Sequence, residues 1–154
     1  MVMEAKTMKD VLQLTQDWHC QLSEHLRNHA DGISSQRRHM LLDYLSLHEE
    51  KLSNILETFL QKSDLGALDT WLYEYTDRHK VIHEDPRNIA FGQMSEEEIA
   101  GKVSQLHNGL MDLYTHLYRR AESDSARDLM EQVLDIESSR TKMMHFGAQR
   151  MGEL

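Results

Sequence analysis

Residues 41–52 read LLDYLSLHEEKL, and residues 129–140, much later in the chain, read LMEQVLDIESSR. The two stretches align without a gap, and this alignment places Glu49 opposite Glu137 within the same spacing of apolar residues. Apolar residues at intervals of three and four lie on one face of a helix. Each stretch therefore predicts a helix whose buried face carries one glutamate.

The composition of the whole chain favours helices. Its 154 residues include one proline and seven glycines, and 40% of them are hydrophobic, 28% charged and 6% aromatic. The chain is poor in the β-branched and aromatic residues that strands favour, and its length fits one hydrophobic core. We therefore expect an all-α fold that forms a single domain over residues 1–154.

Capping residues predict where the helices begin and end. Three pairs have the spacing at which a hydroxyl caps the first turn and an acid complements it three residues later: Thr7 and Asp10, Ser95 and Glu98, Ser125 and Asp128. Asp31 and Gly32 predict a helix end with Gly32 in the left-handed conformation, and Pro86 excludes helix at Asp85. We expect long helices over 7–31, 34–62, 95–122 and 124–150, and a shorter one over 65–83.

The lengths of the connections predict the topology. A short connection makes two successive helices antiparallel, whereas the roughly 30 residues between the second and third long helices can run the length of a bundle. We therefore expect a four-helix bundle of two antiparallel hairpins, joined by a long crossover that contains the short extra helix.

Glu49 and Glu137 need partners, because a buried carboxylate must pair, take up a proton or bind a metal ion. A structural ion pair is one interpretation, with Arg140 one turn from Glu137 and His48 beside Glu49 as partners. A metal site is the other. Glu49→Leu is expected to be tolerated by the metal-free protein or to stabilise it, because the desolvation cost of the carboxylate is lost.

The two-hairpin layout and the inward glutamates resemble the ferritin-like superfamily, including the rubrerythrin-like proteins. In its di-iron members two helices each supply a Glu and the other two each supply a Glu-x-x-His pair. Here Leu52 and Arg140 stand where these histidines are expected, and the first and third long helices offer no clear inward glutamate. The resemblance therefore implies a ferritin-like bundle whose di-iron centre is degenerate or absent.

Three functions follow from this resemblance and from the ten histidines of the chain. The first is a structural or regulatory interaction module without a cofactor. The alternative is a variant site for a single iron or manganese ion, formed by Glu49 and Glu137 with nearby histidines: His48, His19 and His107. The third is hemerythrin-like binding of iron or oxygen.

The spacings His79-x-x-x-His83 and His107-x-x-x-x-Asp112 carry the resemblance to hemerythrin. Hemerythrin also needs a His-x-x-x-Glu on its second helix, and no histidine here has Glu four residues later. His25 and His29 are also one turn apart, but they stand in the last turn before Gly32, where we expect them to be solvated.

Charge and composition narrow the class of protein further. A net charge of −9 disfavours binding to nucleic acid, and no stretch has the 18 uncharged apolar residues of a membrane span. The single Cys20 and the absence of a signal-peptide pattern fit the cytoplasm. No motif for a nucleophile or a phosphate loop indicates an enzyme.

We expect a homodimer, with contacts at Trp71, Leu72 and Tyr75.

Overall fold

The computed structural model describes residues 6–32, 35–72 and 84–152. Within these ranges the long helices are α1 (Met8–Asp31), α2 (Gln36–Lys62), α5 (Glu96–Arg120) and α6 (Asp124–Gly152). The connection between α2 and α5 contains α3 (Leu65–Leu68) and two 3-10 helices, η1 (Pro86–Asn88) and η2 (Phe91–Gln93). These ranges contain no strand, so the all-α prediction is confirmed.

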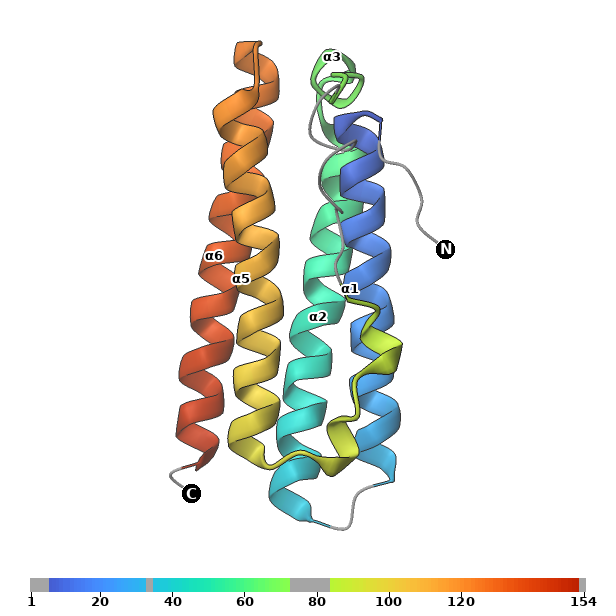
Figure 1. The fold of residues 1–154 in the computed structure, drawn as a ribbon, viewed down its shortest axis with the longest axis vertical. Coiled ribbons are helices and arrows are strands. Elements are labelled where there is room, and N and C mark those ends of the chain that lie inside the picture. The colour runs from blue at the N-terminus through green and yellow to red at the C-terminus, as the bar shows by residue number, and fades with distance from the viewer. Residues whose placement is uncertain (1–5, 33–34, 73–83, 153–154) are drawn as a thin grey trace.

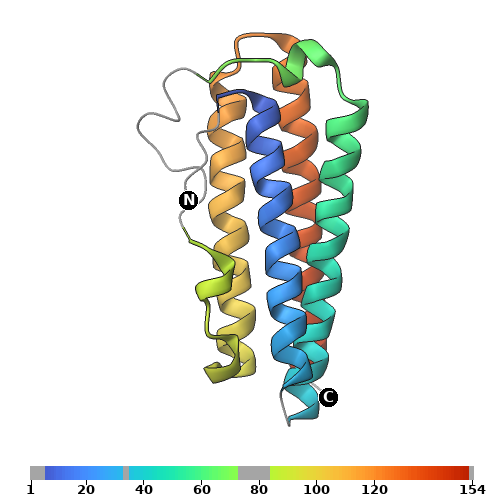
Figure 2. The ribbon, with the colours of Figure 1, turned by 90° about the vertical axis from the view of Figure 1, so that its right-hand side faces the viewer.

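The long helices form two antiparallel hairpins that pack side by side (Figure 1). α1 packs along α2 and α5 packs along α6, while α2 joins the two hairpins through contacts with α5 and α6. The connection starts with α3 at one end of the bundle, and η1 and η2 follow α1 toward the opposite end (Figure 2). The predicted crossover along the bundle is therefore confirmed.

The capping boxes predicted at the starts of α1 and α5 are present, whereas the one predicted at Ser125 is wrong. Thr7 and Ser95 each accept from the backbone N–H three residues later, and the acids Asp10 and Glu98 return the bond. At the last helix the cap is Ser123 and not Ser125, because Ser123 Oγ accepts the N–H of Ala126 at 3.2 Å. The helix therefore begins at Asp124.

The end of α1 and the short crossover helix also differ from expectation. Gly32 follows α1 with φ −95°, so the predicted left-handed conformation is wrong. The helix expected over 65–83 ends at Leu68, because the chain then extends and pairs with the segment before α1. Met8 N–H donates to the Thr70 carbonyl and Leu72 N–H donates to that of Lys6, each at 2.9 Å. Residues 73–83 lie outside the described ranges.

Side chains of α1 hold the later part of the crossover. Trp18 Nε1–H donates to the Glu84 carbonyl at 3.1 Å, and His25 Nε2 lies 2.7 Å from the Ile89 carbonyl, to which its N–H donates. His25 is therefore a partly buried tether, and the expectation that it is simply solvated was wrong.

In the described part of the chain, no helix is long and apolar enough to cross a membrane.

Candidate metal centre

Each long helix directs one fully buried histidine or glutamate into the middle of the bundle. These side chains are His19 from α1, Glu49 from α2, His107 from α5 and Glu137 from α6, and none is more than 1% exposed. Leucines and valines one turn away on the same faces form the surrounding core. The helical repeat that buries the apolar residues therefore buries these four groups as well.

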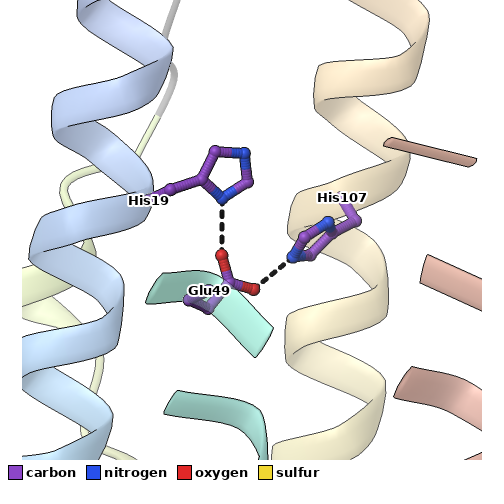
Figure 3. Close-up of side chains that lie close together, drawn as sticks. All are labelled: His19, Glu49 and His107. Carbon is purple, nitrogen blue, oxygen red and sulfur yellow. Dashed lines mark hydrogen bonds and ion pairs between the residues drawn. The ribbon is translucent and has the colours of Figure 1, made fainter. Parts of the chain in front are cut away.

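Glu49 lies between the two imidazole rings, which reach it from helices on either side (Figure 3). His19 Nδ1 is 2.5 Å from Glu49 Oε2, and His107 Nε2 makes a short contact with Glu49 Oε1. One carboxylate thus contacts both histidines. His19, Glu49 and His107 can each turn one ligand atom toward a common point, with these atoms within 4.8 Å of one another.

Glu137 lies on the other side of both rings. Its Oε1 is 2.8 Å from His107 Nδ1, and its Oε2 is 3.4 Å from His19 Nε2. Thr141 adds a further contact, with Oγ1 3.3 Å from His107 Nδ1. Because the Thr141 hydroxyl donates to the Glu137 carbonyl at 2.7 Å, its oxygen is left to accept the His107 Nδ1–H.

The charges of the four groups support one another. Burial alone lowers the pKa of a histidine, but the attraction of Glu137 and Glu49 outweighs it and raises the pKa of His19 to about 9. The same balance raises the pKa of His107 to about 10. Burial raises the pKa of both glutamates, and the two cationic rings more than reverse this effect. Without metal the cluster therefore holds two cations and two anions.

Both glutamates lie in the interior, as predicted, but their expected structural partners were wrong. Glu137 pairs with His19 and His107, whereas Arg140 is half-buried and makes no ion pair with it in the described ranges. His48 is buried beside Tyr44, with ring centroids 4.6 Å apart, and lies outside the cluster. Burial, then Arg140 and Lys51, lower the pKa of His48.

The residues that resemble hemerythrin do not come together in the described structure. His107 is fully buried whereas Asp112, five residues later, is exposed. His79 and His83 lie outside the described residues. Of the candidate ligands, the structure therefore brings together His19, Glu49, His107 and Glu137.

A sequence signal for His107 exists within α5. Val103, His107, Leu110 and Tyr114 are buried at spacings of four, three and four, whereas Leu106, which also fits an apolar stripe, is only half-buried. The two stripes differ by one residue, which is too little for a pattern of apolar residues to resolve. Packing of the hairpins selects the stripe that contains the histidine.

The donors fit a divalent transition metal ion. Two imidazoles and one carboxylate form a ligand set typical of non-haem ferrous iron. His19 Nε2 and Glu137 Oε1 are buried without a well-directed hydrogen bond among the described residues. The Glu-x-x-His pairs of a di-iron centre are absent, since Leu52 and Arg140 occupy those positions. The residues present therefore fit one ion and not two.

The fold has a counterpart among solved structures. A protein of Thermotoga maritima, described as a candidate ferritin-like diiron-carboxylate protein, matches with a TM-score of 0.60 and 12% identity over 95% of this chain and 96% of that one. No family model matches the chain, and no curated protein does either. The fold is therefore ferritin-like.

Proposed function

We propose that this protein is a ferritin-like bundle that binds a single divalent metal ion, iron or manganese, through His19, Glu49 and His107. The observation that carries this proposal is the meeting of buried donors from three long helices, α1, α2 and α5, at the centre of the bundle. Burying four charged groups carries a large desolvation penalty. A metal-binding role explains why the protein keeps these groups in its interior.

Each of the four residues has a distinct role in this proposal. His19 Nδ1 and His107 Nε2 face Glu49, so these nitrogens and a Glu49 oxygen hold the ion. The opposite nitrogens face Glu137, whose carboxylate lies 2.8 Å from His107 Nδ1 and 3.4 Å from His19 Nε2 and orients both rings through its charge. Carboxylates commonly orient metal-binding histidines in this way. Glu137, expected from the sequence to be a ligand, is on this geometry a positioning residue.

An ion with three protein ligands keeps coordination positions open for water or another small ligand. Burial of the four residues limits those ligands to molecules of a few atoms. The proposed function is therefore the binding of one metal ion in a closed interior.

Metal analysis and titration test the proposal. Apo protein titrated anaerobically with ferrous or manganous ion is expected to bind one ion per chain, and Glu49→Gln and His107→Ala are expected to weaken binding by at least about tenfold. Glu50→Gln is the matched control, because Glu50 is adjacent in sequence but half exposed and pairs with Arg27. Two tightly bound ions, or equal affinity in the Glu49 variant, would contradict the proposal.

The complete ring of ion pairs favours a second function. Two imidazolium groups and two carboxylates balance one another's charge without metal, as expected for a structural or regulatory module that needs no cofactor. On this alternative the purified wild type contains no metal and does not bind iron or manganese. The same titration therefore separates the two functions.

A further inference from the structure

A small cavity lies beside His107, next to the Thr141 hydroxyl that contacts the His107 ring. It lies between α5, α6 and Leu45 of α2, has a volume of about 10 Å³, and is bordered by His107 and Thr141. A cavity needs roughly 10–15 Å³ to hold one water molecule. The buried centre therefore has space for a single small species on its His107 side.

This cavity leads toward a larger groove. Ala100 of α5 and His145 and Ala148 of α6 border both the cavity and a groove of about 610 Å³. Its lining residues come mainly from the start of α5 and the end of α6, which lie at the same end of the bundle (Figure 1). The groove of about 520 Å³ at the opposite end shares no lining residue with this cavity.

The residues along this line suit a small cation. Ala100 and Ala148 place no long side chain between the groove and the cavity, and His145, an exposed imidazole, borders both. Glu96 and Glu97 line the groove together with a single cationic residue, Arg37, so its lining carries an excess of negative charge. Imidazole and carboxylate are ligands for iron and manganese.

We propose that this groove and cavity are the access path of the divalent metal ion, and that His145 binds the ion transiently on its way to His107. The proposal rests on the proposed function, because it needs a metal ion at the centre. It adds a kinetic role for Ala100, Ala148 and His145, none of which holds the ion at equilibrium.

Filling the passage tests this path. Cobalt(II) chloride serves as the probe, because its visible absorption changes on binding and stopped-flow mixing measures the uptake rate. Ala148→Leu is expected to slow uptake by at least about tenfold, since a close-packed interior leaves little room around an added isobutyl group. Equilibrium affinity is expected to stay within about twofold, because it depends only on the free and bound states.

Ser139→Leu is the matched control, because it adds a leucine to the exposed surface of the same helix. His145→Ala is a second variant, and it removes a side chain instead of adding one. Slower uptake in this variant cannot come from blockage of the path, so it reports the loss of the transient imidazole ligand. Uptake is expected to be slower and equilibrium affinity unchanged. Circular dichroism checks that each variant folds.

The outcomes distinguish the two proposals. A wild type that binds no cobalt refutes the proposed function and the path together. A wild type that binds cobalt, with uptake in both Ala148→Leu and His145→Ala as fast as in Ser139→Leu, refutes the path alone. A rate that follows the unfolding free energy of each variant, rather than its position, shows that the ion enters by opening of the bundle and also refutes the path.

Discussion

His19 and His107 each use both ring nitrogens, one toward Glu49 and one toward Glu137. They lie on the inner faces of α1 and α5, whose described buried residues include no glutamate. The two histidines supply two neutral donors once their protons leave. They also give the metal-free cluster its own cations, so Arg140 is not needed to balance the charge.

The structure reverses the expectation for Glu49→Leu. Glu49 contacts two cationic rings, so its removal leaves His19 and His107 with Glu137 alone. Breaking a buried ion pair by removing one partner costs about 3–5 kcal/mol. We therefore predict a loss of that size in the unfolding free energy of the metal-free protein, measured by urea denaturation with a chelator present.

Glu50→Leu provides the comparison for that measurement. Glu50 is half exposed and pairs with Arg27 on the surface, where an ion pair contributes at most about 1 kcal/mol. Equal unfolding free energies for Glu49→Leu and the wild type would show that the buried ion pairs do not stabilise the fold.

Metal binding is predicted to release two protons. The pKa values of about 9 for His19 and about 10 for His107 mean that both rings are cationic at neutral pH. The ion must displace the proton on each nitrogen that faces Glu49, so the net charge of the site does not change. Apparent affinity should therefore rise with pH, by about 100-fold per unit below pH 9, and level off near pH 10.

Calorimetry in buffers of different ionisation enthalpy measures this proton release directly. Two protons per ion are expected for the wild type near pH 7. Release of no protons would place the ion at groups that are already deprotonated, and therefore away from the His19 and His107 pair.

At the scale of the elements, the start of α6 gives a test of local structure. Ser123, and not Ser125, caps this helix, and replacing a capping serine by alanine costs about 1 kcal/mol. We predict that Ser123→Ala lowers the unfolding free energy by this amount, whereas Ser125→Ala leaves it nearly unchanged. Thermal and urea unfolding of the two variants provide the comparison.

The hairpin of α5 and α6 also fixes part of the centre. Thr141 is one turn after Glu137 on α6 and accepts from His107 on α5. A contact between the two hairpins lies two residues further along α6: the Tyr44 hydroxyl of α2 donates to the Met143 carbonyl at 3.0 Å. A Cβ at Gly147 would lie 1.9 Å from the Tyr44 hydroxyl, so the absence of a side chain there permits this hydrogen bond.

At the scale of the whole molecule, we predict that the chain forms a homodimer. Trp71 is 55% exposed, and Leu72 beside it is half-buried, while Tyr75 lies outside the described residues. Large exposed aromatic side chains often mark interfaces. Light scattering should give twice the chain mass, and Trp71→Ser should shift the equilibrium toward monomer more than Leu65→Ser, which replaces a nearby residue that is 74% exposed.

A wild type that remains monomeric across the accessible concentration range would refute the dimer. An equal effect of the two substitutions would instead place the interface away from Trp71.

The sequence by itself determined the helices, most of their caps and the burial of Glu49 and Glu137. Each of these depends on residues three or four apart along one helix, a relation that is local and therefore visible in the order of residues. The two hairpins and the crossover followed from connection lengths. The cap at Ser123 and the early end of α3 were missed, because neighbouring serines compete as caps and the pairing of Thr70 with Met8 joins distant segments.

Only the tertiary structure decided which groups meet Glu49. His48, adjacent in sequence, turns toward Tyr44, whereas His19 and His107 are 30 and 58 residues away and arrive on other helices. Their meeting depends on the rotation and register of each helix in the bundle, which are set by the packing of all four apolar faces together. The protonation of the rings follows from that packing, since the pKa of a buried histidine depends on the charges placed around it.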